Sequence, residues 1–305
     1  MPSIRFITAD VFTNIRLGGN QLAVIPDARG IPEDLLLPIC REFNYSETTF
    51  VYPAEQPGHT RRLRIFTPGG EVPFAGHPTV GTAVVLAAIG EIPLTDSADG
   101  THIVLEENVG PISVVIRDSH ASGGWAQFSV AKLPEVGPLV PSRGVLARIL
   151  GLETGDLLGT TEKPQAVSCG LPFLIVPLTG VDAVSKARMK TDRWEETLAH
   201  AWASMIWLYA ADPEGGEFHY RARMFAPGIS VPEDPATGSA AAAFAGYLAA
   251  RSSTRSGTLR WTIDQGVEMG RPSKLAIEAD KEDGVITAIR VGGAAVLVSE
   301  GTMAV

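Results

Sequence analysis

Hydrophobic and polar positions alternate over many short stretches of this chain, as they do in half-buried strands. The alternation predicts strands near 3–9, 62–66, 102–106, 111–117, 125–130, 205–210, 258–263, 274–279, 285–291 and 294–299. One or two more strands are expected within 165–177, broken at Gly170–Pro172, and a further strand follows Glu47. Glu33 and Asp34 in a first turn predict a helix over 31–43, and further helices are expected near 78–89, 142–150 and 194–203.

A stretch of small apolar residues at 239–250 reads Ser-Ala-Ala-Ala-Ala-Phe-Ala-Gly-Tyr-Leu-Ala-Ala. A helix that is apolar nearly all round is normally buried, and small side chains let strands approach it closely. Residues 78–89 have the same character. Many short strands around two such helices, with few regular strand–helix–strand alternations, predict an α+β protein of two curved sheets, each wrapped on one helix.

One segment of the chain occurs twice. Arg-x-Phe-x-Pro-Gly begins at Arg64 and again at Arg223, an offset of 223 − 64 = 159. A Gly-[Thr/Ser]-Ala helix start follows each copy, at Gly81 and Gly238, an offset of 238 − 81 = 157. The repeat predicts two similarly built halves. We place them at 1–118 and 119–305, and the last strand is open to crossing into the first half.

The two copies carry ionisable residues at matched places, since His77 and Asp234 each stand directly before a proline. A helix start presents unpaired N–H groups and a positive dipole end, which can hold an anion. Two such groups from two halves suggest an acid–base site in the cleft between them. The plainer alternatives remain open: Asp234 or Thr237 as a helix cap, and His77 as a hydrogen-bonded loop histidine.

Glu47 is the third candidate, because it follows Ser46 at a turn-to-strand junction among aromatic residues. An apolar setting disfavours the charged form of a carboxyl group and suits it to proton shuttling. The alternative is a solvated glutamate at a strand start. Ser239 is interpreted as a donor at a helix start rather than a nucleophile, because no Gly-x-Ser-x-Gly elbow surrounds it.

Composition narrows the classes of partner and cofactor. In 305 residues, acidic side chains exceed basic ones by 34 − 25 = 9, so neither nucleic acid nor an anionic membrane is an expected partner. The chain shows no signal-peptide pattern and has only two cysteines, which favours a cytoplasmic location. Histidine pairs with metal-ligand spacing and glycine-rich nucleotide motifs are missing from the sequence, so we expect no metal and no cofactor.

Several ordered motifs together resemble the phenazine-biosynthesis PhzF family of isomerases. They span nearly the whole chain and are Asp10-Val-Phe-Thr, Gly19-Asn-Gln-Leu-Ala-Val, Ser46-Glu47-Thr-Thr-Phe, Phe74-Ala-Gly76-His77-Pro-Thr-Val-Gly, Glu233-Asp234-Pro-Ala-Thr-Gly238-Ser239-Ala and Gly266-Val-Glu-Met-Gly-Arg-Pro-Ser. The resemblance implies a diaminopimelate-epimerase-like fold, a homodimer, and a proton shift without cofactor or metal. Gly19-Asn-Gln replaces the commoner Gly-Asn-Pro, which affects no catalytic residue.

The resemblance also implies roles for individual residues. Glu47 matches the carboxylate that takes and returns the proton, and His77 and Asp234 match partners that bind and orient the substrate. The positions matching those that hold the substrate, largely by its carboxylate, are Gly76, Gly238, Ser239 and Asn20. Related epimerases and racemases use one cysteine from each half, whereas these loops offer His77 and Asp234.

From residues and resemblance together we predict a cofactor-independent isomerase that moves a proton within a small carboxylate-bearing substrate. An epimerase or lyase acting on a hydroxy or amino acid is the first alternative, because a poised carboxylate can also epimerise or eliminate. A non-catalytic small-molecule-binding protein is the second. The sequence does not name the substrate.

Overall fold

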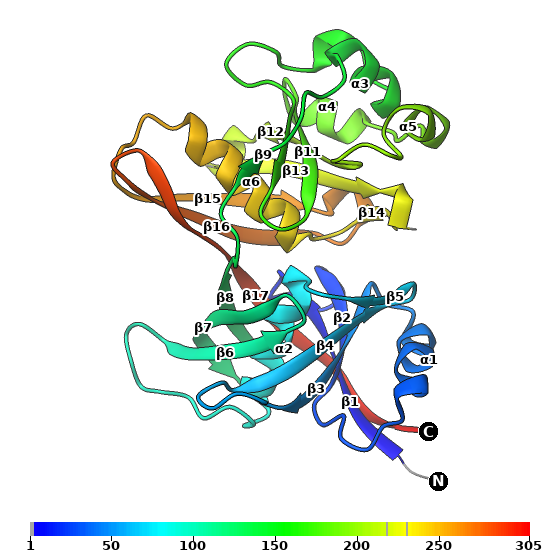
Figure 1. The fold of residues 1–305 in the computed structure, drawn as a ribbon, viewed down its shortest axis with the longest axis vertical. Coiled ribbons are helices and arrows are strands. Elements are labelled where there is room, and N and C mark those ends of the chain that lie inside the picture. The colour runs from blue at the N-terminus through cyan, green and yellow to red at the C-terminus, as the bar shows by residue number, and fades with distance from the viewer. Residues whose placement is uncertain (1–2, 218, 230) are drawn as a thin grey trace. The chain divides into compact units, whose positions relative to one another are not determined.

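The computed structural model describes residues 3–217, 219–229 and 231–305. The chain forms two compact units (Figure 1): unit 1 comprises Met1–Ala131 and Val291–Val305, and unit 2 comprises Lys132–Arg290. The boundary expected at 118/119 falls inside strand β7 (Gly110–His120). Because β7 pairs with β8 (Gly123–Ser129), both strands stay in unit 1.

The sheet of unit 1 closes on itself. Its strands pair in the order β1 (Ser3–Val11), β2 (Asn20–Ile25), β3 (Glu47–Pro53), β4 (Arg61–Thr67), β6 (Thr101–Glu107), β7, β8 and β17 (Val285–Ala304), and β17 pairs with β1 again. The β2–β3 and β4–β6 pairs are parallel. Strand β5 (Gly70–Val72) folds back on β4 as a short hairpin.

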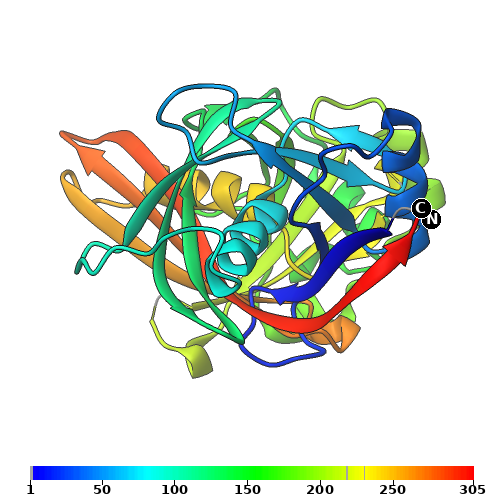
Figure 2. The same ribbon diagram turned by 90° about the horizontal axis from the view of Figure 1, so that it is seen from below.

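Helix α2 (Gly76–Ala88) fills the inside of this closed sheet, as Figure 2 shows in cyan. Every residue from Gly76 to Ala87 is buried. A Cβ at Gly81 would lie 2.6 Å from atoms of both Leu22 and Val11, so the helix needs its small residues to fit. Helix α1 (Glu33–Phe43) covers the outer face, where Leu36, Ile39 and Cys40 pack on Phe50 and Phe66.

Unit 2 repeats this plan around α6 (Gly238–Arg251), whose residues are almost all buried. Its strands pair in the order β9 (Glu135–Val136), β10 (Gln165–Ser168), β11 (Pro172–Pro177), β12 (Met205–Ala211), β13 (His219–Ala226), β15 (Gly257–Gln265) and β16 (Ser273–Glu282), with β14 (Val231–Asp234) beside β13. The β11–β12 and β13–β15 pairs are parallel, as their counterparts are in unit 1.

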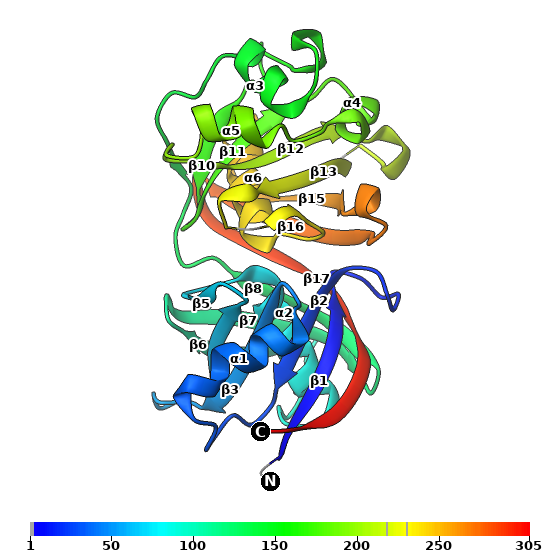
Figure 3. The same ribbon diagram turned by 90° about the vertical axis from the view of Figure 1, so that its right-hand side faces the viewer.

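Strand β12 separates two hydrophobic layers because its side chains alternate. Trp207 and Tyr209 contact Phe244 of α6. Ile206 and Leu208 face the other way, toward α3 (Arg143–Leu150), α4 (Val181–Lys186) and α5 (Thr191–Thr197), which lie on the opposite side of the strands in Figure 3. The short 3₁₀ turns are η1 (Thr154–Asp156), η2 (Pro213–Gly215), η3 (Pro227–Ile229) and η4 (Val267–Met269).

The repeated Arg-x-Phe motif forms the same clamp in both units. Arg64 donates to both carboxylate oxygens of Glu71, at 2.8 and 2.6 Å, and joins β4 to β5. Arg223 donates to both oxygens of Glu233, at 2.7 and 2.8 Å, and joins β13 to β14. Each arginine also lies over the phenylalanine two residues along. The repeat in the sequence therefore encodes a structural element as well as a site.

The predicted α+β class, with two similar halves each built round a small-residue helix, is confirmed. Three predicted elements, one helix and two strands, differ from the structure. The helix expected at 194–203 begins and ends earlier, at Thr191 and Thr197. The strands expected at 285–291 and 294–299 are one strand, β17. Gly292 does not interrupt it because this glycine allows close packing rather than a turn: its Cβ would lie 2.8 Å from Ala126 O.

Elements β5, β14 and α4 are too short to give a periodic signal, and the sequence did not predict them. None of the helices in the described ranges is long and apolar enough to cross a membrane.

Candidate active site

Three predicted residues of unit 1 lie together because three elements begin at the same place. Asn20 is the first residue of β2, Glu47 the first of β3, and His77 the second of α2. The parallel β2–β3 pair, with Leu22 opposite Glu47, brings the two strand starts alongside each other. The local fold therefore delivers a carboxylate, an imidazole and an amide to one site.

These side chains form a chain of polar contacts. Ser46 Oγ donates to Asn20 Oδ1 at 2.9 Å, and Asn20 Nδ2 lies 3.2 Å from His77 Nδ1. On the other side of the ring, His77 Nε2 lies 3.2 Å from Glu47 Oε2. Asn20 and His77 are buried, whereas the Glu47 side chain keeps 16% of its surface exposed. Glu47 and Ser46 are thus partly exposed, although Glu47 Oε2 itself is buried.

His77 is a neutral imidazole in this setting. Burial lowers its pKa from 6.5 to about 3, partly opposed by a hydrogen bond with the Gln21 backbone. Because Ser46 donates to the Asn20 carbonyl oxygen, the Asn20 amide nitrogen donates to His77 Nδ1. The remaining ring proton is then on Nε2, which lies 3.2 Å from Glu47 Oε2 without the geometry of a hydrogen bond. A neutral ring, not an imidazolium, faces the carboxylate.

The start of α2 supplies the backbone part of this site. Gly76 is its first residue and is buried. The N-cap, Ala75, has no side chain that could bind the first-turn N–H groups. Those groups and the positive end of the helix dipole suit an anion.

The predicted residues of unit 2 cluster at the junction of β14 and α6. Asp234 ends β14, and Gly238 and Ser239 begin α6. Thr237 Oγ1 donates to Asp234 Oδ2 at 2.5 Å. Asp234 and Gly238 are buried, whereas Ser239 is half-exposed.

Gln265, which sequence reasoning missed, holds this junction. Its Oε1 accepts from Thr237 N at 2.9 Å, and its Nε2 donates to Asp234 O at 2.8 Å. Gly266 follows with a φ of 73°, and a Cβ there would lie 2.6 Å from Pro235 O. The closing Gly266–Ser273 motif was the only available signal, and its first residue supports the Asp234 loop.

The structure therefore assembles two groups of predicted residues, one in each unit. Contacts connect Glu47, His77 and Asn20 in unit 1, with Gly76 beside His77. Asp234, Gly238 and Ser239 lie within one short segment of unit 2. That both groups serve a single cleft stays a prediction.

Met205 takes the place of Glu47 in the repeat. Leu22 pairs with Glu47 at the start of β3, and Phe173 pairs with Met205 at the start of β12. The next residues, Thr48 and Ile206, pair with the two phenylalanines of the repeated motif. At this position a carboxylate is present in unit 1 only.

Both cysteines are free thiols, and burial raises the pKa of each, which disfavours the reactive thiolate. Cys40 is buried and its Sγ donates to Phe66 O at 3.2 Å, as expected for a core residue. Cys169 lies near α6, with its Sγ 3.6 Å from Ala242 O, and burial raises its pKa to about 12. Neither thiol has the lowered pKa of a nucleophilic cysteine.

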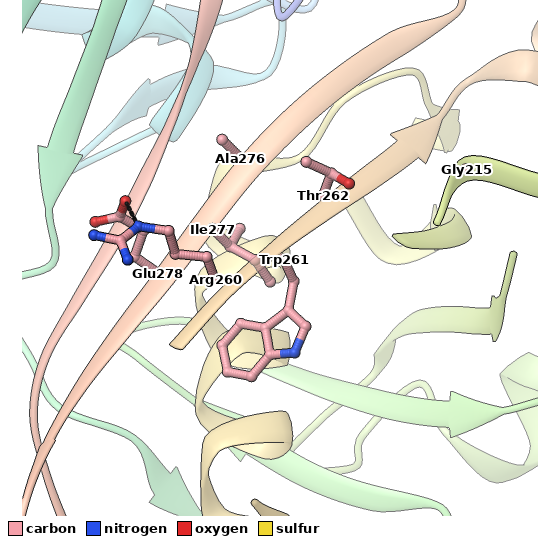
Figure 4. Close-up of a pocket in the computed structure, with 7 residues that line it drawn as sticks. All are labelled: Gly215, Arg260, Trp261, Thr262, Ala276, Ile277 and Glu278. Carbon is pink, nitrogen blue, oxygen red and sulfur yellow. Dashed lines mark hydrogen bonds and ion pairs between the residues drawn. The ribbon is translucent and has the colours of Figure 1, made fainter. Parts of the chain in front are cut away.

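A surface hollow of about 240 Å³ lies elsewhere, on β15 and β16 (Figure 4). It is lined by Gly215, Arg260, Trp261, Thr262, Ala276, Ile277 and Glu278. Its two charged residues bind each other, with Arg260 Nε 3.1 Å from Glu278 Oε1. The hollow contains none of the predicted site residues and presents no unpaired charge to a ligand.

A protein-family model described as "Phenazine biosynthesis-like protein" (PhzC-PhzF) matches residues 9–301. The chain belongs to this family. An uncharacterized isomerase of Mesorhizobium japonicum is 38% identical over 306 residues, covering 99% of each chain. The trans-2,3-dihydro-3-hydroxyanthranilate isomerase of Pseudomonas fluorescens is 31% identical over 301 residues, covering 98% of each.

A solved PhzF-family protein from Bacillus anthracis has the same fold, with a TM-score of 0.87, 23% identity and full coverage of both chains. The predicted family and fold are confirmed. Like its named relatives, the protein is an isomerase, as the sequence predicted.

Proposed function

We propose that this isomerase moves a proton within a small carboxylate-bearing substrate by acid–base chemistry at Glu47, with no cofactor. The supporting observation is the contact between Glu47 Oε2 and the neutral His77 ring, 3.2 Å apart and itself held by Asn20. A general base needs a fixed position and access to the substrate, and the Glu47 side chain is held against His77 and is partly exposed.

In the proposed reaction, the Glu47 carboxylate takes a proton from a substrate carbon. The electron pair of the broken C–H bond moves into the adjacent unsaturated system. Glu47 then returns the proton to a different carbon, so that substrate and product have the same mass. His77 limits the position of Glu47 by contact, with Nε2 3.2 Å from Oε2. It does not relay the proton, because a ring with a pKa of about 3 stays neutral near pH 7.

The remaining predicted residues are proposed to bind the substrate. Helices α2 and α6 begin at Gly76 and at Gly238–Ser239, and the backbone N–H groups there can donate hydrogen bonds to the substrate carboxylate. Asp234, held by Thr237, is proposed to bind a polar group of the substrate. The Pseudomonas relatives are named for trans-2,3-dihydro-3-hydroxyanthranilate. We therefore propose a cyclic, unsaturated carboxylic acid bearing amino or hydroxyl groups as the substrate class.

The test is deuterium uptake in heavy water, followed by mass spectrometry. The panel contains trans-2,3-dihydro-3-hydroxyanthranilate with other cyclic and linear amino and hydroxy acids. Wild type, Glu47→Gln and the exposed control Glu42→Gln are compared. Uptake without loss of a leaving group, present in wild type and the control and lost in Glu47→Gln, supports the proposal.

Other outcomes identify the alternatives. Release of water or ammonia shows a lyase, and inversion at one carbon with unchanged connectivity shows an epimerase. Binding without exchange across the whole panel favours a ligand-binding protein. Uptake that persists in Glu47→Gln removes Glu47 from the mechanism.

A further inference from the structure

Glu107, which the proposed chemistry does not use, is a buried acid beside the His77 turn. It is the last residue of β6 and is 7% exposed. Its Oε1 lies 2.7 Å from Thr79 Oγ1. Its Oε2 is buried without a hydrogen-bond partner among the described residues. An ionised carboxylate in such a place would be costly, so its protonation state needs explanation.

The Thr79 hydroxyl is shared between two oxygen atoms. Its Oγ1 lies 2.8 Å from Ala75 O, four residues earlier, and 2.7 Å from Glu107 Oε1. A hydroxyl carries one proton, and a carbonyl oxygen can only accept. If Thr79 donates to Ala75, both short contacts are hydrogen bonds only when Glu107 brings a proton of its own.

Unit 2 has a residue at the position equivalent to Glu107, and strand pairing identifies it. Parallel pairing sets Leu105 of β6 opposite Arg61 and Ile263 of β15 opposite Tyr220, and 220 − 61 = 159, the offset of the repeat. Two residues further along each strand stand Glu107 and Gln265.

Glu107 and Gln265 are thus equivalent positions. Gln265 is fully buried, and its Nε2 lies 3.1 Å from Thr237 Oγ1, to which it donates. Thr79 is the first residue after Pro78, which follows His77. Thr237 is the second residue after Pro235, which follows Asp234, so the two threonines differ by one position in the repeat. A neutral group that can both donate and accept fills this position in unit 2. A protonated glutamic acid has a similar shape and can also do both, although it has one donor hydrogen where the amide has two.

We propose that Glu107 is a neutral carboxylic acid that donates a hydrogen bond to Thr79 and so fixes the Ala75–Thr79 turn carrying Gly76 and His77. It is a positioning residue. It does not touch the proposed substrate. The consequence for turnover rests on the proposed role of His77, whereas the protonation state of Glu107 does not.

The electrostatic surroundings agree with this assignment. Burial raises the pKa of Glu107 to about 8. The charged groups near this end of β6 are paired with one another. Glu106 lies 2.8 Å from His59. Glu71 is paired with Arg64 and also accepts a hydrogen bond from Asn108. His77, on the turn itself, is neutral. Glu107 is thus left without a cation to stabilise its charge in the described part of the chain.

The direct test is infrared spectroscopy of wild type and Glu107→Gln, which lacks this carboxyl group. The expected difference spectrum at pH 6 contains a protonated-carboxyl band that Glu107→Gln lacks and that disappears as the pH passes about 8. A difference spectrum showing only carboxylate bands at pH 6 overturns the proposal. This measurement does not depend on any substrate.

A second test follows the His77 ring by NMR in Glu107→Gln, Thr79→Val and the control Thr79→Ser. Wild type is expected to show a shift of the His77 signals near pH 8 that Glu107→Gln abolishes while keeping the neutral-pH signals. Thr79→Val should displace those signals at all pH values, and Thr79→Ser should not. If the His77 signals of Glu107→Gln still shift near pH 8, Glu107 is not the group whose titration His77 senses, and the proposed coupling is wrong.

Activity then separates this inference from the proposed function. Glu107→Gln is expected to keep at least about half of wild-type activity at pH 7 and to lose less of it above pH 8. If Glu107→Gln loses activity at pH 7 with unchanged His77 signals, the positioning role is wrong while Glu47 chemistry can stand. If Glu47→Gln stays active, the proposed function fails, and the spectroscopic result on Glu107 is unaffected.

Discussion

Asn20 Nδ2 lies 3.2 Å from His77 Nδ1, and this contact determines which of the two ring nitrogens of His77 carries the proton. An amide that donates to Nδ1 leaves the proton on Nε2, which is 3.2 Å from Glu47. The surroundings of the proposed base thus depend on Asn20 through the histidine ring. The following predictions test this arrangement and the fold that supports it.

The tautomer of His77 can be measured directly. We expect ¹⁵N NMR to show a neutral ring with the proton on Nε2 from about pH 4 to pH 8, because burial lowers its pKa to about 3. Asn20→Asp replaces the amide donor by an acceptor and should move the proton to Nδ1. Asn20→Ser is the polar control. A wild-type ring protonated on Nδ1 would contradict the assignment.

Glu47→Gln tests the base. Loss of a positioned general base lowers rates by about 10²- to 10⁴-fold. We expect a loss of that size in kcat, with ligand affinity and folded-state spectra little changed. Glu42→Gln, on the exposed face of α1, should behave as wild type. A Glu47→Gln variant within about threefold of wild type in kcat would be incompatible with the proposed mechanism.

His77 and Glu107 should give stability a flat-topped dependence on pH. The pKa of His77 is lowered from 6.5 to about 3, so its contribution is complete above pH 6.5 and is lost as pH falls toward 3. The pKa of Glu107 is raised from 4.5 to about 8, so its contribution is complete below pH 4.5 and is lost as pH rises through 8. Each slope is about 1.4 kcal/mol per pH unit, and the two cancel between pH 4.5 and 6.5.

Urea unfolding at a series of pH values checks this dependence, with Glu107→Gln as the comparison. That variant should lose the downward slope between pH 6.5 and 8. An unchanged slope would show that Glu107 does not titrate as assigned. The reciprocal change, Gln265→Glu in unit 2, should make the unfolding free energy decrease further as the pH rises.

Arg223 is expected to be a major stabilising residue of unit 2. It binds Glu233 and also donates to Val184 O and Ala187 O, at 3.0 and 2.8 Å. Arg223→Ala leaves these groups unsatisfied in a buried place, which costs about 3 to 5 kcal/mol of unfolding free energy. Arg193→Ala, which breaks the exposed pair with Glu196, should cost less than about 1 kcal/mol. Equal costs would contradict the assignment of the clamp.

Gly81 tests the packing of α2 inside its sheet. Gly81→Ala places a Cβ 2.6 Å from Leu22 and Val11 and should cost about 1 to 3 kcal/mol. Gly69→Ala, at an exposed site where the nearest atom is 3.5 Å away, should change stability by about 0.5 kcal/mol or less. Thermal unfolding of the two variants measures the difference. A fully stable Gly81→Ala variant would show that the sheet can expand.

The sequence alone determined the fold class, the repeat and most elements, because these depend on local pattern. Period-2 alternation located the strands, and the run of small residues located α6 and showed that it is buried. Glu47, His77 and Asp234 could be named because each stands at an element boundary within a distinctive motif. The helix at 194–203 was misplaced: it begins at Thr191 and ends at Thr197, and its buried Trp194 donates to Ser204 O at 2.8 Å, a contact that no local pattern gives.

Only the tertiary structure decided how the site residues are held. Glu107 lies 28 residues from Thr79 in the chain, as Gln265 does from Thr237, and strand pairing rather than local sequence brings each pair together. The His77 tautomer depends on Asn20, 57 residues away. The state of a buried proton is set by the few polar groups that share its space. Those groups come from distant strands, so no local pattern in the chain could reveal it.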